Sequence, residues 1–322
     1  MKTALTKLLW FLGILFAMLI GGSLMGKTML RNGDYFKLKP DTKLIVLGHS
    51  QPECGLNDSL LPHVGNFSQG GESYFYTYQK LKKLVADNPQ IETVIVSYAN
   101  NQINERMDKW IWDEVHLYNS YPKYHFMMDG EDFSLLAKHN FRELLSADAK
   151  AFKDFASFMV KNRKNYLAGS KWGGYFYLER NKVDSLLKTD YLARERRDIR
   201  LELSEANLEY LSKIVAFCKE KNIRVFFLRM PIHPDLPFLK NESQYQNIKK
   251  ERFPEVELLD FKNFPVADGE FGDFDHLNHK GAKRFSAYFK TMLEQGILDS
   301  RQKQKDIDAT IKTLFLKDSI PR

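Results

Sequence analysis

Residues 43–54 read KLIVLGHSQPEC and determine how the rest of the chain is interpreted. The short apolar run at 43–48 predicts a fully buried strand of a parallel sheet. Ser50 follows this strand directly. Because open α/β sheets bind ligands at the carboxyl ends of their strands, a serine at this position can face a cleft as a nucleophile. The alternative is a serine that only caps the next helix.

Three more apolar runs resemble the first, and helical patterns lie between them. We expect strands at residues 93–97, 224–229 and 256–260, and helices at residues 72–87, 204–221 and 278–295. Strands that alternate with helices indicate an α/β protein whose central parallel sheet is covered on both faces.

The alternation stops between about residues 105 and 200. This segment is helical in pattern and rich in aromatic residues, among them Trp110, Trp112 and Trp172. We expect a helical insertion whose aromatic side chains pack its own core or line a sugar-binding cleft. No repeat or flexible linker separates it from the α/β domain at 43–298, so a second independent domain is not predicted. The charged tail, residues 299–322, is predicted to be a peripheral helix.

The N-terminus carries one long apolar run. Residues 8–25 read LLWFLGILFAMLIGGSLM without a charge, and as a helix they span about 27 Å, close to the thickness of a hydrocarbon core. We interpret residues 1–26 as an uncleaved signal anchor, or transmembrane helix, and residues 27–42 as a juxtamembrane connector. A cleaved signal peptide is the alternative, since residues 21–23 are small, but no Ala-x-Ala triplet follows.

The orientation of this anchor follows from its flanks. A basic, signal-like segment with Lys2 and Lys7 begins the chain, and long domains cross membranes largely regardless of their charge. We therefore expect the body of the protein to be extracytoplasmic, on a bacterial cell membrane. The basic residues after the run oppose this orientation under the positive-inside rule.

The formal net charge of +7 favours an anionic partner, such as an acidic glycan, a teichoic-type polymer or a lipid surface, or else a solvated surface. No nucleic-acid-binding motif accompanies the charge, so no nucleic-acid partner is predicted. Cys54 and Cys218 suit either one disulfide or, as we favour, two buried thiols. Metal-ligand spacing and a phosphate loop are both missing from the sequence, and we predict no metal or other cofactor.

A second motif lies near the C-terminus, where residues 271–286 read FGDFDHLNHKGAKRFS. Asp273 and His276 are three positions apart, so on a short turn the carboxylate can accept the Nδ1 proton while Nε2 reaches Ser50. Asp275 is an alternative orienting group that we expect to be an exposed carboxylate. His233, after the strand at 224–229, is predicted either to contact substrate or to be a loop residue.

Together these motifs resemble those of the SGNH (GDSL-like) hydrolase and acyltransferase superfamily. Gly48-His49-Ser50 corresponds to its Gly-Asp-Ser, and Asp273 and His276 correspond to its closing Asp-x-x-His. The resemblance covers roughly residues 43–101 and 223–296. It implies a three-layer flavodoxin-like fold with the catalytic residues Ser50, Asp273 and His276. His49 replaces the family's aspartate and could, like His233, contact substrate.

The middle signatures of the family match less closely. Residues 66–73 read NFSQGGES where the family has Asn-x-Gly-x-x-Gly, with Ser68 in place of the first glycine. This implies that the backbone N–H of Ser68 stabilises the oxyanion, with Gly70 as a neighbouring candidate. Residues 98–101 read YANN where the family has Gly-x-Asn-Asp. Asn100 is therefore the expected side-chain donor, and Asn101 is the second choice.

An anchored, extracytoplasmic domain of this type looks like the accessory proteins of alginate O-acetylation and teichoic-acid D-alanylation. Such proteins work beside a multipass membrane-bound O-acyltransferase. The resemblance thus implies a serine esterase or O-acyltransferase that acts on a cell-envelope glycan through an acyl-Ser50 intermediate. The alternative is a non-catalytic envelope scaffold or glycan-binding protein that retains the fold.

Overall fold

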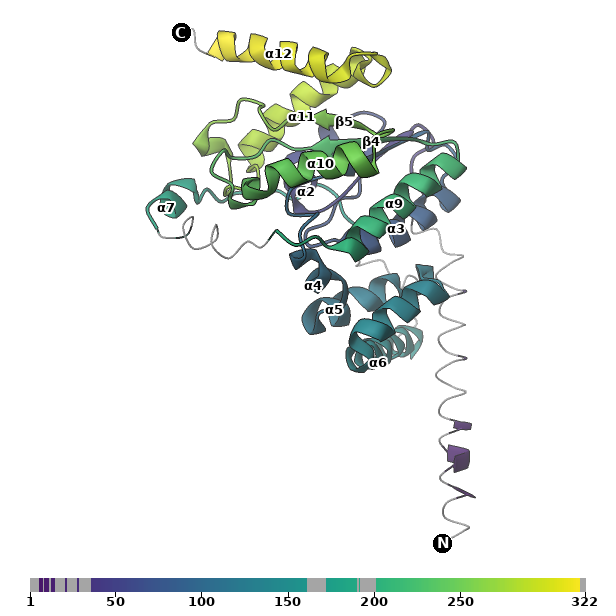
Figure 1. The fold of residues 1–322 in the computed structure, drawn as a ribbon. Helices are drawn as coiled ribbons and strands as arrows, with labels where there is room; N and C mark the ends of the chain where they lie inside the picture. The colour runs from purple at the N-terminus through teal and green to yellow at the C-terminus, as the bar shows by residue number, and fades with distance from the viewer. Residues whose placement is uncertain are drawn as a thin grey trace. The chain divides into compact units, whose positions relative to one another are not determined.

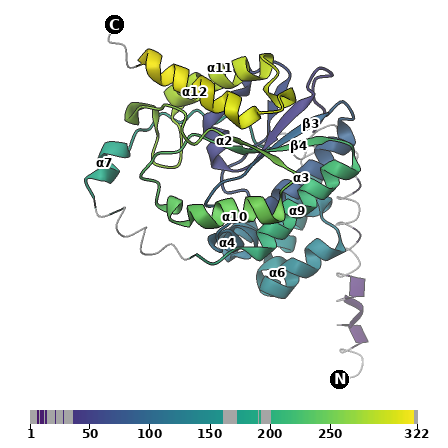
Figure 2. The ribbon, with the colours of Figure 1, turned by 45° about the horizontal axis from the view of Figure 1, so that its top comes forward.

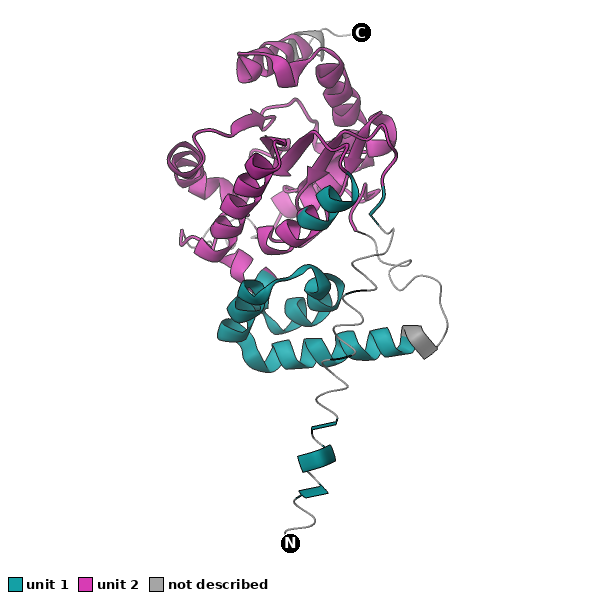
Figure 3. Ribbon diagram, turned by 90° about the vertical axis from the view of Figure 1, so that its right-hand side faces the viewer, with its two compact units in different colours: residues 1–37, 82–88, 111–170 teal, residues 38–81, 89–110, 171–322 magenta. Residues whose placement is uncertain are grey.

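The computed structural model describes residues 36–160, 172–189, 191 and 201–318, with a few positions between 6 and 28. The chain divides into two compact units (Figure 3). The helical unit comprises Met1–Lys37, Lys82–Asn88 and Ile111–Ser170, and the α/β unit comprises Leu38–Leu81, Pro89–Trp110 and Lys171–Arg322. The predicted membrane anchor falls largely outside the described residues, and none of the helices that are described is long and apolar enough to span a bilayer.

The α/β unit is built on a parallel five-stranded sheet with the order β2-β1-β3-β4-β5. Its strands are β1 (Leu44–Leu47), β2 (Val64–Asn66), β3 (Thr93–Ser97), β4 (Arg224–Arg229) and β5 (Glu257–Asp260). This is the flavodoxin-like order, and the predicted α/β class with a central parallel sheet is confirmed. The sequence analysis missed β2, because three residues are too short for a periodic pattern.

Helices cover the sheet on both faces (Figures 1 and 2). Those that belong wholly to the α/β unit are α2 (Ser50–Gly55), α7 (Val183–Leu187), α9 (Glu205–Glu220), α10 (Glu242–Arg252), α11 (His279–Glu294) and α12 (Lys303–Asp318). Alternate residues of β4 face opposite layers. Phe226 belongs to the core cluster that contains Phe285 of α11, whereas Phe227 packs edge-on against Phe253, at 5.3 Å between ring centroids. The result is a three-layer arrangement.

The C-terminal tail packs against the edge of the sheet. Ile307 and Ile311 of α12 are buried, and the side chain of Gln304 binds both the N–H and the C=O of Asp260 in β5. These two bonds of 2.9 and 3.0 Å occupy backbone groups that an edge strand otherwise leaves open.

Four further helices in the described part of the chain are α3 (Tyr74–Asp87), α4 (Arg106–Trp112), α5 (Glu114–Tyr124) and α6 (Gly130–Val160). The helical unit contains α5 and α6, and α6 is kinked at Asn140, whose φ of -153° and ψ of 69° are not helical. The segment expected as one insertion, residues 105–200, is divided between the two units. Cys54 and Cys218 are both buried free thiols, so the alternative of two thiols holds.

Candidate active site

Ser50 is the first residue of α2 and lies directly after β1. The cap position belongs to His49, whose side chain makes no capping hydrogen bond, so Ser50 is not the helix cap that the alternative interpretation required. Gly48 permits the close packing of β1 on β3, since a Cβ at this position would lie 2.4 Å from the Cβ of Ser97. The strand and the tight glycine therefore place Ser50 at the carboxyl edge of the sheet.

The three residues of the predicted triad lie together in the α/β unit. The Nε2 atom of His276 is 2.7 Å from Ser50 Oγ, and its Nδ1 atom is 2.7 Å from Asp273 Oδ1. The backbone N–H groups of Asp275 and His276 also donate to Asp273 Oδ1, at 2.9 and 3.0 Å. The turn therefore fixes the carboxylate, which orients the imidazole so that Nε2 can accept the Ser50 proton.

Charges around the triad favour an ionised aspartate and a basic histidine. Burial opposes ionisation of Asp273, but hydrogen bonds and charge from His276, with a further bond from Arg180, lower its pKa well below the ordinary value. Burial likewise opposes protonation of His276, yet the hydrogen bond to Asp273 and the charges of Asp273 and Asp275 raise its pKa above 6.5. A histidine of raised pKa is a stronger general base.

Arg180 forms an ion pair with the second oxygen of Asp273, and the sequence analysis missed it. The two residues are far apart along the chain, and no motif marks the arginine. The Arg180 side chain is 45% exposed, so it also faces solvent next to the triad.

Asp275 and His233 have other partners than those expected. Asp275 is half-buried rather than exposed, and its Oδ1 accepts a 2.8 Å bond from Gln51. His233 is buried, with Nε2 placed 3.2 Å from Asp268 Oδ1 and Nδ1 accepting the N–H of Asp235. Both ring nitrogens are therefore engaged within loops, which fits the loop interpretation of His233 and not a contact with substrate.

The backbone donors expected for the oxyanion are already engaged. The N–H of Ser68 donates to Asn66 Oδ1 at 3.0 Å, and the N–H of Gly70 donates to Glu53 Oε2 at 2.8 Å. In this arrangement Ser68 is therefore held by a local turn and its N–H is not directed at a substrate. A Cβ on Gly70 would lie 3.8 Å from the Cβ of Ser50, so Gly70 lies beside the nucleophile.

Asn100 and Asn101 have different surroundings. These reverse the expectation that Asn100, rather than Asn101, is the side-chain donor to the oxyanion. Asn100 is buried, and its carboxamide bonds Asn241 and Glu242 through nitrogen and Arg229 through oxygen. These bonds give Asn100 a structural role. Asn101 is half-buried and interacts with His49, the neighbour of the nucleophile. Asn101 therefore replaces Asn100 as the first candidate for the side-chain donor.

His49 is buried beside the nucleophile. Its Nδ1 atom lies 3.2 Å from Ser97 Oγ, and burial, together with the charge of His276, lowers the pKa of His49 to about 3. The ring is therefore neutral. With 3% exposure it has little surface for the substrate contact that we considered.

Residues 172–182, which we call the strap, connect the loops around Ser50. Three of its backbone N–H groups donate to carbonyl oxygens at 2.8 to 3.1 Å: Gly174 to Ser68, Phe176 to Glu53 and Lys182 to Gly272. Gly173 has a φ of 113°, and a Cβ there would lie 2.3 Å from the carbonyl of Phe67. The sequence analysis did not use the pair Gly173-Gly174, which is the signal that could have indicated this close approach.

A buried lysine connects the strap to the loop at residues 66–73, which we call the oxyanion loop after its expected role. Lys80 of α3 donates to Glu72 at 2.8 Å, to the carbonyl of Trp172 at 3.0 Å and to the carbonyl of Phe67. The side chains of Lys80 and Glu72 are 0% and 2% exposed. Sequence alone could not identify this pair, because the surrounding residues resemble those of a solvated helix face.

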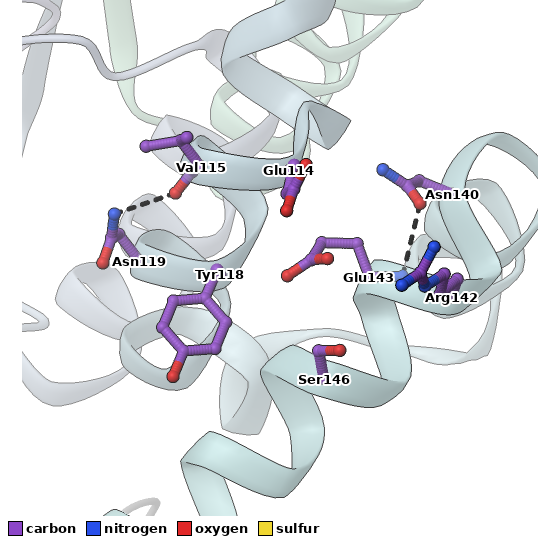
Figure 4. Close-up of a pocket in the computed structure, with 8 residues that line it drawn as sticks. All are labelled: Glu114, Val115, Tyr118, Asn119, Asn140, Arg142, Glu143 and Ser146. Carbon is purple, nitrogen blue, oxygen red and sulfur yellow. Dashed lines mark hydrogen bonds between the residues drawn. The ribbon is translucent and has the colours of Figure 1, made fainter.

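The helical unit has a separate cavity of about 560 Å³ between α5 and α6 (Figure 4). Its lining comprises Glu114, Val115, Tyr118, Asn119, Asn140, Arg142, Glu143 and Ser146. Arg142 and the two glutamates make it polar, but no histidine accompanies Ser146. It therefore lacks the arrangement of nucleophile and base that surrounds Ser50. Among the described residues we find no cluster of three or more His, Cys, Asp or Glu side chains that could hold a metal ion.

Comparison with known proteins adds one match. A family model for an uncharacterised family matches residues 178–298, which is less than half of the chain. The matched part includes Asp273 and His276 but not Ser50. No curated protein and no solved structure matches the chain.

Proposed function

We propose that this protein is a membrane-tethered serine enzyme that transfers or removes acyl groups on a cell-envelope glycan. The observation that supports this most is the continuous relay from Ser50 Oγ through His276 to Asp273, with both hydrogen bonds at 2.7 Å. A serine is a weak nucleophile unless a positioned base removes its proton, and this arrangement supplies the base and its orienting carboxylate.

The reaction proceeds through an acyl-enzyme. Ser50 Oγ attacks the ester carbonyl while His276 Nε2 takes its proton, and the proton then passes to the alkoxide as the ester C–O bond breaks. A glycan hydroxyl or water next gives its proton to His276 and attacks the acyl carbon, and His276 returns this proton to Ser50 Oγ as the bond between Oγ and the acyl carbon breaks. Asn101 and the backbone N–H of Ser50 are the candidate donors to the oxyanion that forms in each step, and the N–H of Gly70 can join them when its bond to Glu53 is released.

The membrane setting of this proposal comes from the sequence. The apolar run at residues 8–25 supports an N-terminal anchor, with the α/β unit outside the cytoplasm of a bacterial cell. A multipass membrane-bound O-acyltransferase is the partner that would deliver the acyl group, and the SGNH superfamily is the class that the motifs favour.

A non-catalytic scaffold or glycan-binding protein is the second candidate, and one observation favours it. The Glu53 carboxylate occupies the N–H of Gly70, so a negative group lies near the position where the oxyanion must develop. Such a group opposes the tetrahedral intermediate unless it is protonated or displaced.

The test uses the full chain in detergent with p-nitrophenyl acetate as substrate. We expect turnover by the wild type and a loss of about 10³-fold or more in Ser50→Ala and in His276→Ala, since triad members act as a unit. The matched control is Ser59→Ala, an exposed serine. Equal rates in the wild type and both triad variants would overturn the triad. Absence of turnover, together with absence of an acyl-Ser50 adduct by mass spectrometry in intact membranes, would favour the scaffold.

A further inference from the structure

A pocket of about 260 Å³ lies next to His276 in the α/β unit. Asp273 and His276 line it, whereas Ser68 and Gly70, on the oxyanion side, do not. In a serine acyl transfer the base exchanges protons with the leaving group and with the incoming acceptor, so both must approach on the histidine side. The position of the pocket is therefore that of the acceptor or leaving group, and this step rests on the proposed function.

The walls of this pocket are largely apolar. The side chains that form them are Leu186 of α7, Tyr191, Leu236, Pro237, Phe238 and Phe274. Leu236 and Phe274 are buried, and Phe238 is half-buried. An apolar surface with aromatic rings suits the C–H face of a sugar. The volume lies just below the roughly 300–1,000 Å³ of small-molecule sites, which suits one sugar residue rather than a chain.

On the rim of this pocket the cations are more exposed than the carboxylates: the side chain of Arg180 is 45% exposed against 16% for Asp273, and Lys182 is exposed whereas Asp275 is half-buried. The two carboxylates that line the pocket already have partners: Asp273 binds His276 and Arg180, and Asp275 binds Gln51. Lys182, in contrast, is exposed, and its ammonium group has no ion-pair partner among the residues that the structure describes.

Arg180 adds donors to the same rim. A guanidinium has five N–H donors, and Arg180 uses one nitrogen for Asp273 while 45% of its side chain stays exposed. Arginine and lysine next to each other bind carboxylate and phosphate groups well. The strap therefore brings two cations to the mouth of an apolar pocket beside the general base.

We propose that this pocket is the subsite for an anionic acceptor, a sugar that carries a carboxylate or phosphate group. The sugar ring packs against the apolar wall around Phe238. Its anionic substituent binds Lys182 and the outer face of Arg180, so that an acceptor hydroxyl reaches His276.

The test measures binding without chemistry. Full-length Ser50→Ala chain in detergent is titrated by calorimetry with trigalacturonate, with glycerol 3-phosphate and with neutral maltotriose. We expect at least one anionic probe to bind about tenfold or more tightly than maltotriose, and which of the two binds identifies carboxylate or phosphate as the anion. Raising the ionic strength should weaken this binding.

Variants of Lys182, at the end of the strap, and of Lys188, directly after α7, locate the binding group. In the Ser50→Ala background, Lys182→Gln should weaken anion binding about fivefold and Lys182→Arg should restore it, whereas the matched control Lys188→Gln, outside the pocket, should leave it unchanged. Equal binding of maltotriose, no binding of either anionic probe, or equal effects of Lys182→Gln and Lys188→Gln would each refute the inference. If the wild type forms no acyl-Ser50 adduct but the Ser50→Ala chain still binds the anionic probe, only the proposed function is refuted.

Discussion

Glu53 accepts a 2.8 Å hydrogen bond from the backbone N–H of Gly70, a residue that lies beside Ser50. Glu53 lies one turn after the nucleophile on α2, and burial raises its pKa above the ordinary 4.5 although the Gly70 N–H and Lys80 oppose this. The carboxylate thus holds the oxyanion loop in place and at the same time brings a negative charge close to the reaction.

Removing this charge while keeping the acceptor should therefore increase activity. In Glu53→Gln the new carboxamide oxygen can still accept the Gly70 N–H, so we expect kcat/KM for p-nitrophenyl acetate to rise about fivefold near neutral pH. The gain should shrink at acidic pH, where the wild-type carboxyl becomes protonated. Glu209→Gln, on the surface of α9, is the control. A decrease in kcat/KM would show that the carboxylate assists catalysis.

Asn100 and Asn101 should separate stability from catalysis. Asn101→Ala should lower kcat about 10²-fold with little change in Tm, because it removes an oxyanion donor. Asn100→Ala should instead lower the free energy of unfolding by about 1–3 kcal/mol, because the buried Arg229 loses a partner. Hydrolysis assays and thermal unfolding of both variants check this. The opposite pattern would restore Asn100 as the donor.

The pH dependence of activity should report His276 and its neighbour Arg180. Neutral His276 is the base, so kcat/KM should fall as the pH decreases through its pKa, which is raised above 6.5. The charge of Arg180 lowers this pKa, so Arg180→Gln should move the acidic limb of the pH–rate profile to higher pH, and Arg180→Lys should largely preserve it.

The control for that experiment is Arg224→Gln, since Arg224 is paired with Asp299 at an exposed position of the α/β unit. An unchanged acidic limb in Arg180→Gln, or a shift to lower pH, would mean that the arginine does not act on the histidine through its charge.

The buried pair of Lys80 and Glu72 should dominate the stability of the strap. Lys80→Met leaves the Glu72 carboxylate buried without its cation, and we expect the free energy of unfolding to fall by about 3–5 kcal/mol. The double variant with Glu72→Gln should recover part of this loss. Denaturant unfolding of the full chain measures both.

For comparison, Lys43 and Glu92 form a pair whose side chains are 59% and 63% exposed. Lys43→Met should change the free energy of unfolding by no more than about 1 kcal/mol. A similar small effect at Lys80 would show that the strap does not depend on this lysine.

Local patterns in the sequence were sufficient to predict the fold class and the contact between Asp273 and His276, which is one half of the relay. The apolar runs that became β1, β3, β4 and β5 are readable because buried parallel strands are continuous and apolar. The turn that brings Asp273 to His276 is equally local, since its two backbone hydrogen bonds span only two and three residues. The pairing of His276 with Ser50, 226 residues away, was a hypothesis that joined two distant motifs, and the family resemblance supported it.

Only the tertiary structure decided which neighbouring groups face the nucleophile. Asn100 and Asn101 are adjacent in sequence, but successive residues of a loop point in different directions, and the contact with Arg229 was decisive for Asn100. Three other residues also act on partners that lie elsewhere in the sequence: Arg180 binds Asp273, 93 positions away, Lys80 binds Glu72, 8 positions away, and Glu53 binds Gly70, 17 positions away. Their roles depend on how the strap and the sheet edge close around Ser50, because burial and charge at a site are properties of the packed chain.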